Sequence, residues 1–572
     1  ELDDTVVVTA AGRRFELVTS ISRPGGGWYQ IGGQGGEQAA WESAGERQWR
    51  GRGWRVQRQI ERQGARIAIR DTYTNTSEAD LGWHLAYRLA LGQAAVPTVY
   101  LGGNDDATIN STPAAANPTL FVPLGALGLG MVYEDDVLRA QAAARYHEQP
   151  QSVAVETERF ALPPGGSYTT ALALYVLPGA DYFDFINQLR SDWGVRQTIP
   201  GPIVWGWHPE GINPLRDEDL KAAIERLGIR QFVSGGGWVD RTRPAEGPLQ
   251  IGFGTGVLAP YFGPMRERMR LAADKVRRAG PRTQVLYYTH SFFNEPEAEP
   301  QDFADSWITR SDGSRFENGW GGVYTVSRGV YPTRDNRFGA AWAESVETLL
   351  RSGADGIYWD DSNHPTGLND PVTYDRWDGH TALLDPETFA IRQKVGHLYL
   401  LSKDYKLWLA SRLLARGASM LGNGQPVTLD ENRMAWPRFV ETHQALRRGL
   451  DSHLYTPLSY GAINLSIAGI RERLAIGLLH YRVGLADRSD VLRHCYPITI
   501  RELHAGWIVG DERVVTMLSG SYGWPGETVA ARLRLYEADG SARPVLELAP
   551  AERHPVTVPE GGVAILERLG PR

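Results

Sequence analysis

Alternation of apolar and polar residues dominates the first third of the chain. Clear examples are Val6–Val8, Arg14–Val18, Trp54–Tyr73, Leu81–Leu89 and Tyr168–Val176. Because successive side chains of a strand point to opposite faces, this pattern predicts half-buried β-strands separated by turns. A convincing helical pattern first comes at Tyr182–Trp193. We therefore expect an N-terminal antiparallel β-sandwich over residues 1–198.

The pattern changes at Pro200-Gly201-Pro202, after which short apolar strands alternate with helical stretches. The expected strands are Ile203–Trp207, Gln231–Ser234, Gln284–Thr289, Gly356–Trp359, Ala418–Leu421, Arg438–Val440, Thr456–Tyr460 and Cys495–Ile500. The expected helices include Asp217–Leu227, Pro264–Ala279, Arg337–Arg351, Gly396–Ala415 and Arg471–Val483. Eight βα units predict a (β/α)₈ TIM barrel, which we place at residues 199–493.

Alternation returns in the last part of the chain. The runs are Trp507–Val509, Val514–Met517, Arg532–Tyr536 and Gly562–Leu566. They predict a small C-terminal β-sandwich over residues 494–572. A chain of 572 residues exceeds what one hydrophobic core usually organises, so a multidomain protein of three such parts is consistent with its length.

Charge and cysteine content exclude several classes of function. The formal net charge is −7 and no basic block occurs, which argues against nucleic-acid binding and against a membrane-surface patch. No apolar run is long enough to span a bilayer. Cys495 is the only cysteine, so an intrachain disulfide and a cysteine-based zinc site are both excluded.

The chain starts at Glu1 without a signal-like segment, as a processed or trimmed chain would. We expect a soluble protein of bacterial type. Its location could be secreted or periplasmic, or else cytoplasmic. The oligomeric state is left undetermined. The 18 Trp and 24 Tyr residues often lie beside Gly, Asn, Asp and His. Aromatic rings can stack on the C–H faces of sugars, although large proteins also bury many aromatics.

Polar and aromatic residues recur where the predicted barrel strands end. In TIM-barrel enzymes the reacting groups come from these carboxyl ends and the loops that follow them. The candidate substrate-binding residues are Trp205, His208, Trp238, Asp240, His290, Trp359, Asp361, His364, Asn423 and His443. Trp207 and Trp320 are further candidates for stacking, with core packing as the alternative for each tryptophan.

The strongest signal is the fourth strand, which stops abruptly at Asp360 and Asp361. A carboxylate there projects into the barrel mouth and can act as nucleophile toward an anomeric carbon. The alternative is that the two residues cap the next helix. Because a strand has a period of two, only one of them should point inward. We take Asp360 as the nucleophile and Asp361 as a supporting residue.

A retaining glycosidase needs a second carboxyl group that stays protonated. Glu441 follows the apolar sixth strand, and partial burial near another carboxylate would raise its pKa. We take Glu441 as the acid/base, with an ordinary surface glutamate as the alternative. The rival carboxyl groups are Glu431, Asp240, Glu295 and Glu210.

Four histidines fall at predicted strand ends, namely His208, His290, His364 and His443. They could in principle ligate a metal, but no HExxH pair or other close ligand spacing occurs. The glycine-rich loop Gly252–Gly256 lacks a Walker lysine and the Rossmann spacing. We therefore expect hydrogen bonds from the histidines to sugar hydroxyls, and neither a metal nor another cofactor.

The stretch Asp355-Gly356-Ile357-Tyr358-Trp359-Asp360 resembles the strand-four nucleophile motif of retaining α-glycosidases. This group includes the α-galactosidase and α-glucosidase clans and the endo-α-N-acetylgalactosaminidase family. The segment Arg62–Asn75 is similar to strand pairs in their N-terminal sandwiches. The chain departs from the best-known pattern in reading Trp359-Asp360-Asp361-Ser362-Asn363, and no second motif around Glu441 matches one family.

The resemblance implies a glycoside hydrolase that retains configuration, acts on an α-linked glycoside, oligosaccharide or polysaccharide, and forms a glycosyl-Asp360 intermediate. Two other hypotheses stay open. One is a non-catalytic carbohydrate-binding protein on a barrel scaffold. The other is a metal-dependent hydrolase or lyase that uses the rim histidines. The sugar, the linkage and exo or endo action are left undetermined.

Overall fold

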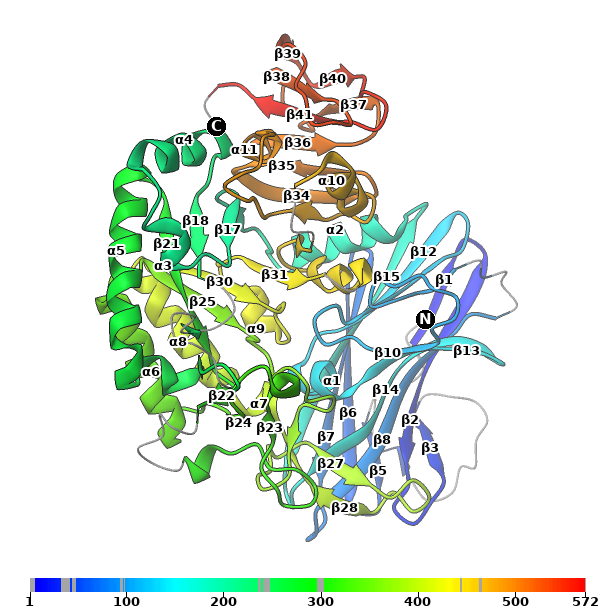
Figure 1. Cartoon of the computed structure of the whole chain (residues 1–572). Helices are drawn as coiled ribbons and strands as arrows, with labels where there is room; N and C mark the ends of the chain where they lie inside the picture. Colours follow the sequence, from blue (N-terminus) through cyan, green and yellow to red (C-terminus); the bar gives the residue numbers. More distant parts are fainter. Residues whose placement is uncertain are drawn as a thin grey trace.

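Four large β-sheets form the frame of the chain, as a computed structural model shows (Figure 1). The structure describes residues 6–31, 42–43, 48–92, 96, 98–234, 238–239, 247–295, 303–442, 445–461 and 465–570. Two antiparallel sheets come first along the chain, a curled parallel sheet follows, and a third antiparallel sheet comes last.

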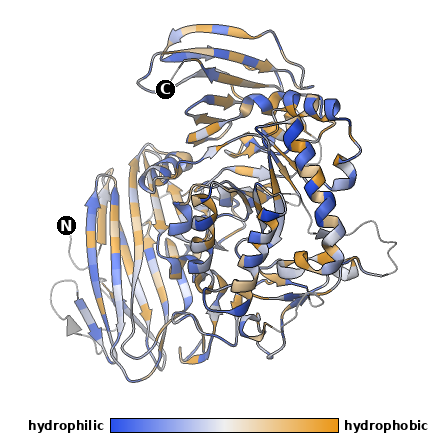
Figure 2. Cartoon of the chain, turned by 90° about the vertical axis from the view of Figure 1, so that its left-hand side faces the viewer, coloured by the Kyte–Doolittle hydropathy of each residue, from blue (hydrophilic) through white to orange (hydrophobic). Residues whose placement is uncertain are grey.

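The two N-terminal sheets pack over a shared core that draws buried residues from both. One contains β1 (Val6–Ala10), β2 (Arg13–Ser22), β3 (Trp28–Ile31), β8 (Leu81–Ala90), β10 (Ser111–Pro113), β13 (Ala143–Glu148) and β14 (Gln151–Leu162). The other contains β4 (Glu42–Ser43), β5 (Gln48–Gly51), β6 (Trp54–Gln63), β7 (Arg66–Asn75), β9 (Tyr100–Leu101), β11 (Thr119–Pro123), β12 (Leu127–Tyr133) and β15 (Ser167–Pro178). Hydropathy alternates along these strands (Figure 2), as the sequence predicts.

An ion pair lies in the core between these sheets. Strand β6 buries Trp54, Val56 and Arg58 on one face. Arg58 donates to both carboxylate oxygens of Asp71 on β7, at 2.8 and 2.6 Å, and both side chains are fully buried. Tyr87 also donates to Asp71 at 3.0 Å. The charge of Asp71 is therefore neutralised and hydrogen-bonded, which a buried carboxylate requires.

The parallel sheet has eight strands in chain order. They are β17 (Ile203–Trp205), β18 (Gln231–Val233), β21 (Gln284–His290), β25 (Gly356–Asp360), β30 (Ser419–Asn423), β31 (Arg438–Glu441), β32 (Leu458–Tyr460) and β33 (Leu479–His480). The sheet curls until Ile203 forms a parallel bridge with Arg482, just after the last strand. The first seven predicted strands are present, with ends that differ by at most two residues.

The eighth predicted strand was wrong. Residues Ile498–His504 form β34 of the C-terminal sheet, and the parallel sheet uses β33 instead. The helix predicted over Arg471–Val483 ends early, because α10 spans only Ile467–Leu474. Gly477 then adopts a left-handed φ of 71°, which turns the chain toward β33.

Helices are distributed unevenly around the parallel sheet. Four long ones cover one side, namely α4 (Asp217–Leu227), α5 (Gly263–Ala279), α6 (Arg337–Arg351) and α8 (Lys403–Ala415). The connections after β30 hold only short pieces: α9 (Leu429–Asn432), η6 (Leu446–Ser452), α10 and α11 (Val491–Cys495). On that side the N-terminal sheets and α2 (Tyr182–Asp192) lie against the barrel (Figure 1).

Smaller elements fill the loops. The short helices are α1 (Asp136–Gln141), α3 (Pro209–Ile212), α7 (Leu398–Leu401), η1 (Gly254–Leu258), η2 (Pro260–Phe262), η4 (Ala304–Ser306) and η5 (Trp320–Gly322). The short strands are β19 (Trp238–Val239), β20 (Ile251–Gly252), β22 (Phe293–Asn294), β23 (Glu317–Asn318), β24 (Ser327–Gly329), β26 (Val372–Thr373), β27 (Ala382–Leu384), β28 (Ile391–Lys394) and β29 (Gly396–His397). Because β29 precedes α7, the helix expected over Gly396–Ala415 starts later and is split.

The last sheet recruits a strand from before the barrel. It contains β16 (Thr198–Ile199), β34, β35 (Trp507–Gly510), β36 (Arg513–Thr516), β38 (Val529–Tyr536), β39 (Leu546–Ala551) and β41 (Val563–Arg568). A two-stranded sheet of β37 (Gly520–Gly523) and β40 (Arg553–Val556) shares a core with it. No helix in the described part of the chain is long and apolar enough to cross a membrane.

The buried pair between β6 and β7 gives a stability prediction. Replacing Arg58 by Ala leaves Asp71 buried without its cation, so we expect the free energy of unfolding to fall by about 3–5 kcal/mol. Urea unfolding followed by fluorescence measures the change. The matched control is Arg70→Ala, which removes an exposed pair with Glu61 and should cost at most about 1 kcal/mol. Equal losses in the two variants would contradict the assignment.

Candidate active site

Asp360, the last residue of β25, is held by three side-chain donors at the carboxyl end of the parallel sheet. Tyr288 donates to its Oδ2 at 2.8 Å. Tyr358 and Asn423 donate to its Oδ1 at 2.7 and 2.9 Å. The two tyrosines are buried residues of β21 and β25. Sequence reasoning named Asn423 but missed both tyrosines, although Tyr358 lies two residues before Asp360 and so shares its face.

Asp361 also turns toward the site, which the strand period alone does not predict. Its φ of 42° lies in the left-handed region, where Asp is better tolerated than most residues. His290 Nε2 lies 3.3 Å from Asp361 Oδ2, and the amide of Thr366 donates to the same oxygen at 2.8 Å. Burial alone would raise the pKa of Asp361, but these partners hold it below the usual value.

His290 is fixed in one orientation. Its Nδ1 accepts the backbone amides of Phe292 and Phe293 at 3.1 and 3.2 Å, and the ring is almost fully buried. An Nδ1 that accepts leaves the ring proton on Nε2, which faces Asp361. The candidate residue His290 therefore lies within the site and bonds a carboxylate.

Glu441 ends β31, and Asn423 ends the intervening strand β30. Burial raises the pKa of Glu441 to about 8, and the charges of Asp360 and Asp361 contribute. Burial and the charge of Asp361 also raise the pKa of Asp360, while His290, Asn423 and Tyr358 oppose that shift.

Asp360 and Glu441 thus differ in how well the site stabilises their ionised forms. Three donors stabilise the ionised form of Asp360. Glu441 retains its proton until about pH 8. Near neutral pH we infer one carboxylate at Asp360 and one carboxylic acid at Glu441, an arrangement suited to acid/base and nucleophilic chemistry on one substrate.

Aromatic rings line the barrel beside these carboxyl groups. Trp205, the last residue of β17, is only partly buried and packs against Tyr460 with ring centroids 5.0 Å apart. The guanidinium of Arg482 lies 4.8 Å from the centre of the Tyr460 ring and hydrogen-bonds its hydroxyl. Phe439 packs between Tyr358 and Tyr460. Tyr460 and Arg482 are additional residues that the sequence candidates did not include.

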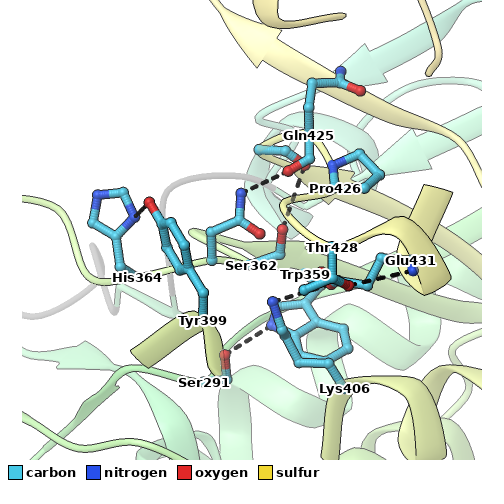
Figure 3. A network of polar contacts seen from close by, with 12 residues as sticks. Ser291, Trp359, Ser362, His364, Tyr399, Lys406, Gln425, Pro426, Thr428 and Glu431 are labelled. Atoms are coloured by element: carbon cyan, nitrogen blue, oxygen red, sulfur yellow. Dashed lines mark hydrogen bonds and ion pairs between the residues drawn. The ribbon is translucent and has the colours of Figure 1, made fainter. Parts of the chain in front are cut away.

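Two predicted stacking platforms are corrected. Trp359 is 1% exposed and faces the helices, where it packs on Trp342 and donates to Ser291 at 2.9 Å (Figure 3). The strand period explains this, since the neighbouring residues Tyr358 and Asp360 face inward. Trp238 is also 1% exposed, and its indole donates to a backbone carbonyl at 3.0 Å. Neither ring presents a face to a ligand.

The remaining candidates are His364, His208, Asp240 and His443. His364 accepts or donates a hydrogen bond with Tyr399 at 3.2 Å (Figure 3), and burial lowers the pKa of His364. His208 precedes α3 and is partly exposed. Asp240 and His443 lie outside the described residues. Within the described residues no three His, Cys, Asp or Glu side chains gather as metal ligands would.

The rival acids have other roles. Glu431 is completely buried and is bound by Lys406 at 3.0 Å and Arg438 at 3.2 Å (Figure 3). Burial would raise the pKa of Glu431, but these cations lower it to about 2. Glu295 accepts from Tyr261 at 2.6 Å, and Glu210 pairs with Arg268 at the surface. Glu441 differs from Glu431 in that its pKa is raised, beside Asp360 and Asp361.

No protein-family model and no curated protein sequence matches the chain. Among solved structures, an α-N-acetylgalactosaminidase from Bifidobacterium bifidum is 13% identical, with a TM-score of 0.48 over 86% of this chain and 90% of that one. The α-galactosidase from Thermus thermophilus, in complex with stachyose, is 12% identical, with a TM-score of 0.37 over 76% and 77%.

A dextranase from Flavobacterium johnsoniae complexed with glucose is 10% identical, with a TM-score of 0.44 over 99% of this chain and 79% of that one. All three are glycoside hydrolases.

The raised pKa of Glu441 predicts how stability depends on pH. The folded protein binds this proton up to about pH 8, whereas an unfolded glutamate releases it near its ordinary value of 4.5. The contribution of Glu441 to stability is therefore present at low pH and lost as pH rises toward 8. Thermal unfolding of wild type and of Glu441→Gln between pH 4 and 9 tests this. As pH rises, the unfolding temperature of the variant should fall less steeply than that of wild type. Parallel profiles would contradict it.

Proposed function

We propose that this chain is a retaining glycoside hydrolase with Asp360 as nucleophile and Glu441 as acid/base. The observation that carries the proposal is the unequal pair at the barrel mouth. Asp360 accepts three hydrogen bonds as a carboxylate, while burial and neighbouring charge keep Glu441 protonated to about pH 8. One nucleophilic carboxylate and one carboxylic acid are the two groups that retaining hydrolysis requires.

Each group has a defined task in both steps. In the first, an Asp360 oxygen forms a bond to the anomeric carbon while Glu441 gives its proton to the departing glycosidic oxygen. In the second, Glu441 takes a proton from water, whose oxygen attacks the anomeric carbon and releases Asp360 as a carboxylate. Tyr288 and Tyr358 hold the nucleophile in place, so its attack needs little reorganisation.

The surroundings of the pair favour a sugar as substrate. The partly buried Trp205 and the Arg482–Tyr460 pair offer an apolar ring beside polar groups. A pyranose presents matching C–H faces and hydroxyls. We further propose an α-linked substrate, on the strength of the strand-four motif that resembles retaining α-glycosidases.

The first test removes the nucleophile. Asp360→Ala should lower kcat on a nitrophenyl α-glycoside by about 10³-fold or more, with the thermal unfolding midpoint retained. The matched control is Asp355→Asn at the opposite end of the same barrel segment, where the carboxylate binds Arg277. Its activity should stay within a few-fold of wild type. Azide added to Asp360→Ala should restore turnover and yield a glycosyl azide of inverted configuration.

NMR of the first-formed sugar anomer tests retention directly. A kcat of Asp360→Ala within about tenfold of the wild-type value would contradict the assignment of Asp360 as nucleophile. Sugar binding without turnover by the wild-type protein would favour a non-catalytic carbohydrate-binding protein instead.

A second test uses pH and the leaving group. Because Glu441 must be protonated, kcat/KM should fall as pH rises through about 8. Glu441→Gln should remove that alkaline limb. It should also slow hydrolysis of an alkyl glycoside by about 10²-fold or more, yet spare the glycosylation step for a dinitrophenyl glycoside, whose leaving group needs no proton. An unchanged alkaline limb would exclude Glu441 as the acid.

A further inference from the structure

A cavity of about 600 Å³ lies between the N-terminal sheets and the barrel loops. Its sheet side is formed by α1, β13 and β14. Its barrel side includes His364 and Gly424, from the loops that follow Asp361 and Asn423, and Val440, which precedes Glu441. The segments that carry the site residues therefore also form one wall of the cavity. The volume is in the usual range for small-molecule sites, roughly 300–1,000 Å³.

Several buried polar atoms of the residues that line the cavity have no hydrogen-bond partner among the described residues, and Arg139 Nη1 and Asn363 Oδ1 are two of them. Arg139 is 1% exposed, and its Nη1 is unpartnered although Nε and Nη2 bind Ala115 O and Asn432 Oδ1. Asn363 Oδ1 is likewise buried and unpartnered, while its Nδ2 donates to Gln425 O at 2.7 Å. Arg139 lies on the sheet side of the cavity and Asn363 on its barrel side. Buried polar groups are nearly always satisfied, so an unpartnered donor on one side and an unpartnered acceptor on the other point to a polar occupant.

Charges in the cavity occur with both signs. Arg159 pairs with Asp370 through two bonds of 2.8 Å, and Arg145 lies 3.2 Å from Glu156. Such internally paired charges suit a neutral ligand with many hydroxyls better than a phosphate or a polycation.

Two carboxylates are placed to receive hydroxyls. Asp451 on η6 is exposed and makes no hydrogen bond or ion pair within the described part of the chain. Glu158 on β14 is 61% exposed and has only a long contact of 3.4 Å to Arg145. Each can accept a hydrogen bond without breaking an existing strong pair.

We propose that this cavity binds the sugar units on the leaving-group side of the scissile bond. The inference rests on the proposed function and deepens it, because it makes an oligosaccharide the substrate rather than a simple glycoside. The barrel mouth holds the sugar that is cleaved. The interface between the N-terminal sheets and the barrel then holds the next units, with Asp451 and Glu158 accepting their hydroxyls.

The experiment compares substrates that share the cleaved sugar. Nitrophenyl α-galactoside is paired with melibiose, raffinose and stachyose, and nitrophenyl α-glucoside with isomaltose and isomaltotriose. The double variant is Asp451→Ala/Glu158→Gln. We expect its kcat/KM on the longest cleaved oligosaccharide to fall about tenfold or more. On the nitrophenyl glycoside, kcat/KM should fall by less than about twofold. The matched control is Glu61→Gln, a similarly exposed glutamate on β6 outside the cavity, at 58%. It should change neither value.

Equal losses on both substrates, or no loss on either, would overturn the inference and leave the proposed function standing. So would a wild-type enzyme that cleaves a nitrophenyl glycoside but no oligosaccharide of its series. A wild-type protein inactive on every substrate overturns the proposed function instead. Calorimetry with stachyose and isomaltotriose then decides the cavity: binding that the double variant weakens supports it, and absent or unchanged binding refutes it.

Discussion

Burial of neighbouring carboxyl groups, reinforced by the repulsion between their charges, sets the pKa values at the barrel mouth. Charging Glu441 beside Asp360 and Asp361 in a poorly solvated site is costly, and its pKa rises to about 8. The donors that surround Asp360 decide which group carries the charge. The same repulsion would be weak in open water. The mouth therefore needs the burial that the curled sheet and its aromatic lining provide.

The alternation of side chains in β25 connects this electrostatic arrangement to the fold. Tyr358 and Asp360 face into the barrel, whereas Ile357 and Trp359 join the cluster that packs α6 and α8 against the sheet. One strand of five residues thus anchors the long helices on one face and presents Asp360, the proposed nucleophile, on the other. A shift of register by one residue would exchange the two sets, so packing of Trp359 also fixes where Asp360 points.

The periodicity of the sequence located most strands of the parallel sheet, because apolar runs bounded by turn residues are a strong signal. It failed at β33, which is two residues long and too short to show a period. Applied consistently, the same period would have placed Tyr358 inward and Trp359 outward. The position of Asp361 was beyond sequence reasoning, since it depends on a left-handed φ that Asp adopts only in some contexts. The partners of Glu431 come from separate segments, so its role as a buried counter-ion was equally hidden.

In the described residues, the connections in the second half of the barrel contain no long helix. The N-terminal sheets and α2 lie against the barrel on that side (Figure 1). Arg190 on α2 donates to the carbonyls of His453 and Tyr455 at 2.9 and 2.5 Å. Asn117 donates to the carbonyl of Leu450 at 2.9 Å. These bonds satisfy backbone groups of η6 and of the segment before β32. That segment follows β31, the strand that carries Glu441. Contacts from the N-terminal part of the chain therefore help to position the barrel segments that follow Glu441, the proposed acid.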